Sequence, residues 1–261
     1  MNPPPKLPVS VCLIAGNEAH RIARTLESVR GWTSEIILLI NDDVTDGTDQ
    51  VAAQFGAKVF REPWKGFGPQ KQSAVEKCTQ PWVLNLDADE VVSPELRAEI
   101  QNLLAAANRR DAHAAYSFPR CSFYCGRWIR HGDWYPDRQI RLWHRGQARW
   151  STAMIHEKLE VAGTIGRLRG DLLHFSNESI NRHVQKIIPF SDEFVRQKSG
   201  CQPSLLDLMV RPGWRFLRAY LLRCGFLDGW QGYYIACLNA FSAATRYAKV
   251  REANLPPQKK P

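Results

Sequence analysis

Regularly spaced cysteine pairs are missing from this chain of 261 residues. The seven cysteines are an odd number, they are scattered, and no Cys-x-x-Cys pair occurs. Disulfide frameworks and tetrahedral zinc sites both need regularly spaced partners, so neither is expected. A reducing compartment such as the cytoplasm fits this cysteine usage best.

Long apolar runs and several well-known binding signatures are also missing. No run approaches the ~18 apolar residues of a membrane-spanning helix, and the N-terminal residues lack a signal-peptide core. Neither G-x-G-x-x-G nor G-x-x-x-x-G-K-[ST] occurs, so a dinucleotide fold or a P-loop has little support. The sequence also lacks helix-turn-helix, RRM and zinc-finger signatures, which argues against a nucleic-acid partner.

Charge is present in excess but is unevenly distributed. Hydrophobic residues make up 44% and charged residues 23% of the chain, as in globular proteins, and the net charge is +9. Residues 1–119 hold 12 basic and 15 acidic side chains, whereas residues 120–261 hold 23 and 11. The basic rear half predicts an anionic partner: membrane lipid, nucleic acid or a phosphorylated substrate.

The front half alternates short apolar runs with helical patterns. The helical pattern that starts at Ile22 is amphipathic, and Ser93 followed by Pro94 predicts an N-cap and a first helical residue. This alternation predicts an α/β fold with a mostly parallel central sheet flanked by helices. Strands are expected at 9–14, 36–40, 58–60 and 82–86, with helices near 22–29, 51–55, 70–78 and 94–104.

Two carboxylates follow the fourth predicted strand. Asp87 and Asp89 are two residues apart, so in an extended segment they point to the same side. Ligands of such sheets bind beyond the carboxyl ends of the strands, and oxygen ligands suit Mg²⁺ or Mn²⁺. The alternative is that these acids only favour the start of the helix that follows Ser93.

Three segments resemble family 2 glycosyltransferases in their order and spacing: residues 9–18, 41–48 and 84–90. More narrowly, the chain looks like the bacterial lipopolysaccharide core β-1,4-glucosyltransferases that act on inner-core heptose. That closer resemblance rests on residues 66–71, 134–143, 155–157, 173–174 and 225–232. It implies a GT-A type nucleotide-diphospho-sugar transferase fold and a UDP-sugar donor.

The resemblance also implies roles for individual residues. Asp87 and Asp89 would hold Mg²⁺ or Mn²⁺ against the donor diphosphate. The nucleoside pocket would be lined by Asn17, Glu18, Asn41 and Asp42.

This chain departs from the family pattern after its second predicted strand. Family members commonly have Asp-Asp-Gly-Ser or Asp-Ser-Gly-Ser where this chain has Asn41-Asp-Asp-Val44. Because the glycine and serine are missing, the turn is expected to differ in conformation from that of other family members. The resemblance therefore predicts the identity of the nucleotide less firmly than it predicts the fold.

Further polar residues are candidates for contacts with the phosphates, the acceptor or the metal. By the same resemblance Lys71 would face the phosphates or the sugar; the alternative is a solvated helix residue. Gln139 and Arg141 are candidates for positioning the acceptor or the diphosphate, because arginine grips phosphate bidentately. His156 and His174 are candidates for a metal or diphosphate contact. The alternative for each is a hydrogen-bonded packing role, which is favoured for His156 and stays equally open for His174.

Glycosyl transfer to a hydroxyl also needs a general base. Glu157, in a section poor in acids, is the first candidate and Asp137 the second. Asp137 is followed by Arg138 and Arg141, so it could instead simply pair with an arginine.

The rear segment turns helical from Leu205. Pro212 and Gly213 are expected to break that helix, and a further helix is expected over 233–250. Apolar and aromatic residues interleaved with arginines predict an interfacial helix on an anionic membrane, the alternative being an amphipathic helix docked on the catalytic domain.

The resemblance implies an inverting enzyme that moves a hexose, expected to be glucose, from a UDP-sugar to a lipopolysaccharide inner-core or related glycolipid acceptor. Residues 1–200 are expected to form the catalytic domain and residues 201–261 a basic helical extension. The expected location is the cytoplasm, at the inner-membrane surface. Two alternatives stay open: another polysaccharide or lipid acceptor, and a non-catalytic scaffold that binds sugar or lipid.

Overall fold

The computed structural model describes residues 5–105, 113–151, 158–177, 179–198 and 202–255. The chain forms two compact units. Unit 1 consists of Met1–Arg120 and Asp137–His174, and unit 2 consists of Cys121–Pro136 and Phe175–Pro261. The expectation that residues 1–200 carry catalysis stays a prediction.

The sheet of unit 1 begins with four parallel strands in the order β3-β2-β1-β4. β8 pairs antiparallel with β4, β6 pairs antiparallel with β8, and the order continues through β12 to β5. The predicted α/β fold with flanking helices is therefore confirmed, but the sheet is mixed, because antiparallel pairing extends the four parallel strands beyond β4. The strands are β1 (Leu7–Ala15), β2 (Thr33–Asn41), β3 (Lys58–Glu62), β4 (Trp82–Asp87), β5 (Glu90–Val92), β6 (Ala115–Tyr124), β8 (Asp137–His144), β11 (Ile165–Arg167), which pairs with β6, and β12 (Leu172–Asn177), while β9 (Ala148–Trp150) and β10 (Leu159–Val161) form a separate pair.

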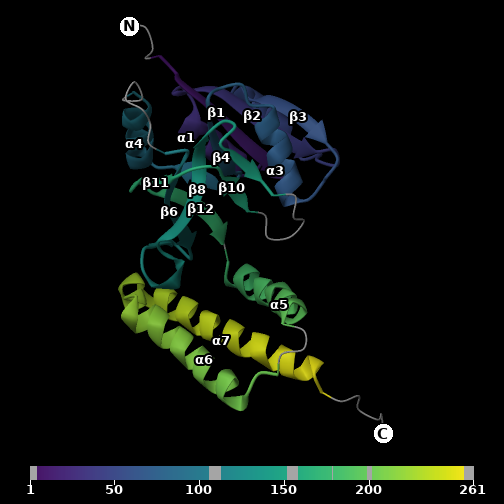
Figure 1. Cartoon of the computed structure of the whole chain (residues 1–261), viewed down its shortest axis with the longest axis vertical. Coiled ribbons are helices and arrows are strands. Elements are labelled where there is room, and N and C mark those ends of the chain that lie inside the picture. The colour runs from purple at the N-terminus through teal and green to yellow at the C-terminus, as the bar shows by residue number, and fades with distance from the viewer. Residues whose placement is uncertain (1–4, 106–112, 152–157, 178, 199–201, 256–261) are drawn as a thin grey trace. The chain divides into compact units, whose positions relative to one another are not determined.

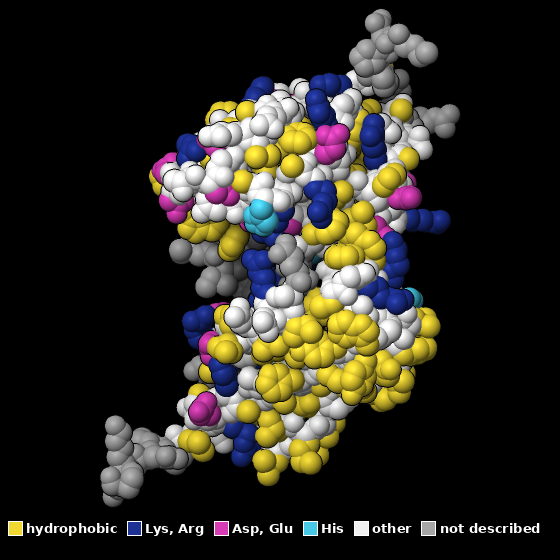
Figure 2. Space-filling model, turned by 180° about the vertical axis from the view of Figure 1, so that it is seen from behind, with side chains coloured by type: hydrophobic (Ala, Val, Ile, Leu, Met, Phe, Trp, Pro, Cys, Tyr) yellow, Lys and Arg dark blue, Asp and Glu magenta, His cyan; other side chains and the backbone are white. Residues whose placement is uncertain are grey.

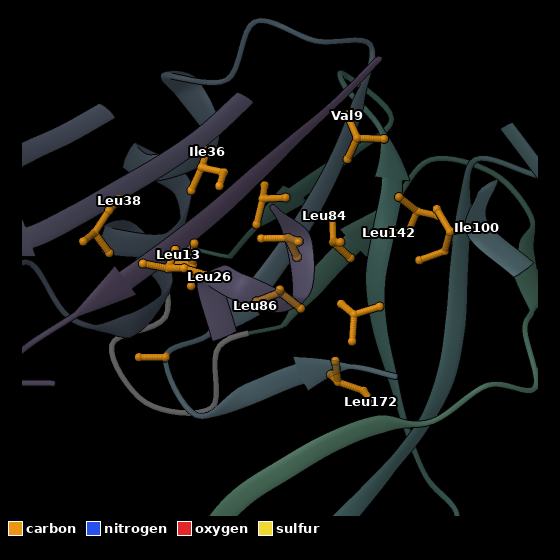
Figure 3. Close-up of a cluster of buried hydrophobic side chains, with 14 of the residues drawn as sticks. Val9, Leu13, Leu26, Ile36, Leu38, Leu84, Leu86, Ile100, Leu142 and Leu172 are labelled. Atoms are coloured by element: carbon orange, nitrogen blue, oxygen red, sulfur yellow. The ribbon is translucent and has the colours of Figure 1, made fainter. Parts of the chain in front are cut away.

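Alternate residues of the central strands bury side chains on opposite faces of the sheet. Val9, Val11 and Leu13 belong to one hydrophobic cluster, and Cys12 belongs to another. Such runs are apolar throughout because both faces of a parallel sheet are covered. Figure 3 shows part of the first cluster, to which strands and helices both contribute: Val9, Leu13, Leu26, Ile36, Leu38, Leu84, Leu86, Ile100, Leu142 and Leu172.

Helices cover both faces of this sheet (Figure 1). α1 (Ile22–Val29), α2 (Thr48–Gln54) and α4 (Pro94–Ala105) contribute to the first cluster, and α3 (Phe67–Glu76) to the second. The predicted cap of α4 is confirmed, because Ser93 Oγ accepts a hydrogen bond from the backbone N–H of Leu96 at 3.1 Å.

The part of unit 2 that the structure describes contains three helices, a short strand and several short turns. They are α5 (Ile180–Gln197), α6 (Leu205–Leu217) and α7 (Gly229–Ala253), with β7 (Arg127–Ile129), the turns η1 (Gly132–Trp134) and η3 (Gly225–Asp228), and a π-helical turn η2 (Arg218–Leu222). In the described parts of the chain, no helix is both long enough and apolar enough to cross a membrane.

The expected helix break at Pro212 is wrong, because α6 continues through this residue to Leu217. A proline inside a helix costs about 3 kcal/mol, since it removes one backbone hydrogen bond. Ser204 and Asp207 start α6 with a reciprocal capping box, and the helix packs along α7. This tertiary packing outweighs the local proline signal.

Candidate active site

Two loops of unit 1 are tied together where β1 and β2 end. Asn17 Oδ1 accepts a hydrogen bond from the backbone N–H of Thr45 at 3.3 Å. The backbone N–H of Glu18 donates to Thr48 Oγ1 at 2.9 Å. These bonds bring the predicted nucleoside residues after β1 beside the loop that follows β2.

Asn41 and Asp42, the predicted nucleoside residues at the end of β2, differ in their surroundings. Gln70 Nε2, on α3, lies 3.5 Å from Asn41 Oδ1, and Gln70 itself is buried. Asp42 is exposed. A buried amide that approaches Asn41 from a helix restrains the side chain at the carboxyl end of β2.

Asp87, the last residue of β4, lies between two cations. Arg141 Nη2 lies 2.5 Å from Asp87 Oδ2, and Lys71 Nζ lies 3.2 Å from Asp87 Oδ1. Burial raises the pKa of Asp87, but the charges of Arg141 and Lys71 outweigh it and hold this pKa well below its usual range. Asp87 is therefore a permanent carboxylate near neutral pH.

Lys71 is buried, so the solvated-helix alternative is wrong. Its side chain is 7% exposed. The ammonium group lies 4.8 Å from the ring centroid of Trp150, a cation–π distance. α3 thus delivers a positive charge, held by Asp87 and Trp150, to the end of β4.

Arg141 also binds Glu90, a residue that the sequence analysis did not select. Arg141 Nη2 lies 2.7 Å from Glu90 Oε1, and Glu90 is fully buried. Burial lowers the pKa of Arg141, but Asp87 and Glu90 more than compensate and raise it further. Glu90 could have been found from the sequence as the third acid of the Asp87–Glu90 segment. It is followed by two valines, and a carboxylate buried among apolar residues needs a charged partner.

Asp89 lies in a more negative environment than Asp87. Arg21 Nη1 lies 3.4 Å from Asp89 Oδ2, and His174 Nε2 on β12 lies 3.6 Å from Asp89 Oδ1. Burial, together with Asp87, Glu90 and Glu18, raises the pKa of Asp89 to about 6 despite the charge of Arg21. Arg21 compensates the acids around Asp89 only in part, so a further cation would be favourable there.

The donor groups around Asp89 fit a divalent cation only in part. Carboxylate oxygens and an imidazole nitrogen are suitable ligands for Mn²⁺, and carboxylates suit Mg²⁺. Within the described ranges, no group of three or more His, Cys, Asp or Glu residues forms a complete metal site. The fit is that of an open site, in which substrate phosphates and water complete the coordination, as is usual for Mg²⁺.

Asp137, at the start of β8, pairs with Arg120, and not with Arg138 or Arg141, which follow it in the sequence. Arg120 donates to Asp137 Oδ2 from Nε at 2.9 Å and from Nη2 at 2.6 Å. Gln139 Nε2 donates to Asp137 Oδ1 at 2.8 Å. Arg120 Nη1 also lies 3.3 Å from Glu90 Oε1, so Asp137 is linked through Arg120 to the cluster around Asp87.

The structure thus brings most of the predicted residues to one edge of the sheet in unit 1. Glu157 and His156 lie outside the described residues. Arg21, Glu90 and Arg120 join the cluster although the sequence analysis did not select them. A cluster of alternating carboxylates and buried cations beyond a parallel strand can bind phosphate and a divalent cation together.

Comparisons with known proteins identify the family of this chain. The family model described as Glycosyl transferase family 2 matches residues 10–164. An uncharacterized glycosyltransferase of Rickettsia typhi is 33% identical over 258 residues, which cover 95% of this chain and 88% of the relative. The lipopolysaccharide core biosynthesis glycosyltransferase LpsC of Rhizobium meliloti is 31% identical over 267 residues, which cover 96% and 97%.

A solved structure supports the fold. The crystal structure of residues 1–349 of S. aureus TarS in complex with UDP-GlcNAc superposes with a TM-score of 0.50 at 13% identity, covering 94% of this chain and 90% of that TarS fragment. The predicted GT-A type fold is therefore confirmed. From the family match and the full-length relatives, the chain belongs to glycosyltransferase family 2.

Proposed function

We propose that this protein is an inverting, metal-dependent hexosyltransferase that uses a UDP-sugar, with glucose as the proposed sugar. The proposed acceptor is a hydroxyl of the lipopolysaccharide inner core or of a related glycolipid. The observation that carries the proposal is the Asp87/Asp89 pair at the end of β4, where Lys71 and Arg141 flank Asp87 closely and Asp89 faces Arg21 at the longer distance of 3.4 Å. LpsC is named for lipopolysaccharide core biosynthesis, and TarS was crystallised with UDP-GlcNAc.

The donor binds at the edge of the sheet in this proposal. Asn17, Glu18, Asn41 and Asp42 line the nucleoside end. Lys71 and Arg141 supply positive charge near the diphosphate, and their burial strengthens that charge because water screens it less. Gln139 orients the acceptor or the diphosphate, and its bond to Asp137 limits its motion.

Asp87, Asp89 and His174 are the residues proposed to hold Mg²⁺ or Mn²⁺. When bound, such an ion stabilises the negative charge that develops on the departing diphosphate. Arg21 holds Glu18 as well as Asp89, so it limits where both carboxylates can move. Asp89 stays close to a compensating charge even without the ion.

The proposed chemistry is one direct displacement. A base carboxylate, Glu157 or in second place Asp137, takes the proton of the acceptor hydroxyl. The acceptor oxygen forms a bond to C1 of the sugar while the bond from C1 to the diphosphate oxygen breaks, and UDP leaves with the electron pair. Attack opposite the leaving group converts an α-linked donor into a β-glycoside.

The proposed place of action is the cytoplasmic surface of the inner membrane, where the basic rear half would face anionic lipid. The alternatives are a different polysaccharide or lipid acceptor, and a non-catalytic scaffold that binds sugar or lipid. Mass spectrometry of the lipopolysaccharide core from cells that lack the gene would identify the missing sugar and its position.

Release of UDP from UDP-sugars, with and without Mn²⁺, tests the enzyme proposal directly. Asp89→Ala should abolish metal-stimulated release and keep the circular dichroism spectrum of the wild type. Glu27→Ala is the matched control, because Glu27 is an exposed acid on α1 whose side chain is 65% exposed. If no UDP-sugar gives UDP release or metal-dependent UDP binding, the scaffold alternative replaces the enzyme.

A further inference from the structure

The segment Gly225–Gly232 of unit 2 forms a tightly locked turn. A Cβ on Gly232 would lie 1.9 Å from the carbonyl oxygen of Gly225, so no larger residue fits there. Asp228 is 2% exposed and accepts hydrogen bonds from the backbone N–H groups of Arg130 at 3.0 Å and His131 at 2.8 Å. The inward side of this turn is therefore rigid and fully used by packing.

The outward side of the same turn carries large apolar side chains into solvent. Phe226 is 46%, Leu227 51% and Trp230 55% exposed. The ring of Phe226 contacts Tyr220, and Tyr220 contacts Tyr233, so the turn is continuous with α6 and α7. Figure 2 shows hydrophobic side chains gathered over one face of the helical unit.

This apolar face is larger than the turn alone. α6 and the turn η2 expose apolar side chains at positions that recur every three or four residues, which places them along one side of the helix. Contiguous apolar patches of this kind mark surfaces that another molecule covers. Members of this face, at 41–76% exposure, are Leu206, Met209, Val210, Trp214, Leu217, Leu221 and Leu222.

Positive charge accompanies the apolar face. Residues 205–253 contain seven Lys or Arg and three Asp or Glu. Asp133, whose side chain is 8% exposed, lies within 2.7 Å of Arg218, 3.5 Å of Arg223 and 3.7 Å of Arg215. One carboxylate thus gathers three guanidinium groups, and the excess positive charge stays at the surface.

This charge favours a lipid surface over a second copy of the chain. A symmetric pair of copies would bring two faces of the same positive sign together, which opposes association. A bilayer with anionic headgroups offers the opposite charge and an apolar interior. Tryptophan and tyrosine, which are amphipathic, favour the boundary between those two regions.

We propose that Phe226, Leu227 and Trp230 form a rigid wedge that inserts into the interface of an anionic lipid bilayer. The inference deepens the proposed function, because it rests on a membrane-bound acceptor and names the surface that meets the membrane. Insertion of apolar side chains supplies most of the binding free energy, since Asp133 and Asp207 already partly neutralise the arginines. The arginines contribute a preference for anionic lipid.

Co-sedimentation of the full chain with vesicles tests this wedge. The vesicles are phosphatidylcholine alone and phosphatidylcholine mixed with phosphatidylglycerol, at ~0.1 M and ~1 M salt, where the Debye length falls from ~10 Å to ~3 Å. The double variant Phe226→Ser/Trp230→Ser should lose at least about tenfold in partitioning to both vesicles at both salt concentrations. Trp64→Ser, at another exposed tryptophan in unit 1, should bind like wild type.

Two results would overturn the proposal. The first is unchanged sedimentation of the double variant, whose exposed positions leave the circular dichroism spectrum unaltered. The second is a dimer that the wild type forms without lipid and the double variant does not form, as measured by analytical ultracentrifugation. In that case a second copy of the chain, and not a bilayer, would cover the apolar face. Neither measurement involves UDP-sugar, so a failure here is distinct from a failure to release UDP from UDP-glucose in solution.

Discussion

Arg141 and Glu90 form a buried ion pair, with Arg141 Nη2 2.7 Å from Glu90 Oε1 and both side chains at most 4% exposed. The same guanidinium holds Asp87, so one arginine of β8 connects β5 with the end of β4. A charge buried this deeply is stable only while its partners remain. The pair is therefore expected to matter for folding as well as for the shape of the site.

Glu90→Gln should lower the free energy of unfolding by about 3 kcal/mol, because Arg141 loses its fully buried counter-charge and keeps the partly exposed Asp87. Urea unfolding followed by circular dichroism measures this loss. Glu95→Gln, at an exposed acid of α4, is the matched control and should change stability by less than about 0.5 kcal/mol. Equal stabilities of the two variants would contradict the structural role of the pair.

Lys71→Met should weaken binding of UDP in the presence of Mn²⁺ by about tenfold, because a buried positive charge near the diphosphate is lost. Isothermal titration calorimetry gives the dissociation constant. Lys65→Met removes a lysine whose side chain is 45% exposed and which pairs with Glu62, and it should leave binding unchanged. Loss of affinity in both variants alike would point to overall charge instead of a specific contact.

Gly232→Ala should destabilise unit 2 by about 3 kcal/mol or more, since its Cβ would meet the backbone of Gly225 at 1.9 Å. Gly213→Ala is the opposite case, because a Cβ at Gly213 in α6 would meet nothing within 4 Å. That change should stabilise the helix by about 0.5–1 kcal/mol. Thermal unfolding of both variants checks the two signs, and a stable Gly232→Ala protein would refute the close packing.

His183 should make the stability of unit 2 depend on pH. Burial and nearby Lys186 lower the pKa of His183 to about 4, and its ring lies 3.1 Å from the Tyr124 hydroxyl. The unfolded chain, with a histidine pKa near ~6.5, binds the proton first. The contribution of His183 to the free energy of unfolding should therefore be complete above pH ~6.5. It should be lost as the pH falls towards about 4.

Urea unfolding at a series of pH values measures this dependence. His183→Gln should remove the His183 contribution to the slope, whereas His20→Gln, at an exposed histidine, should keep it. An unchanged slope in His183→Gln would assign the pH dependence to other groups.

Much of the framework could be predicted from local sequence signals. Strand and helix periodicity predicted the parallel α/β sheet, and Ser93 with Pro94 predicted the start of α4. Both signals act over a few residues, so tertiary structure is not needed to interpret them. The position of Asp87 and Asp89 at the end of a strand followed from the same reasoning.

Long-range pairing decided the surroundings of those acids. Antiparallel pairing of β4 with β8 aligns Leu84 with Leu142 and so brings Arg141 within reach of Asp87. No local pattern encodes this register, because residues 54 apart in sequence meet only when the sheet is complete. Burial of Lys71 and pairing of Asp137 with Arg120 are decided in the same way.

Proline 212 illustrates the limit of local signals. The sequence by itself determined the alternating elements, the acidic pair and the basic rear half, since these depend on residue type and spacing. Only the tertiary structure decided that α6 runs through Pro212, that Arg141 has Glu90 and Asp87 as partners, and that the Gly225–Gly232 turn exposes its aromatic side. The physical reason is that packing and desolvation free energies, which arise between distant segments, exceed the local propensities they oppose.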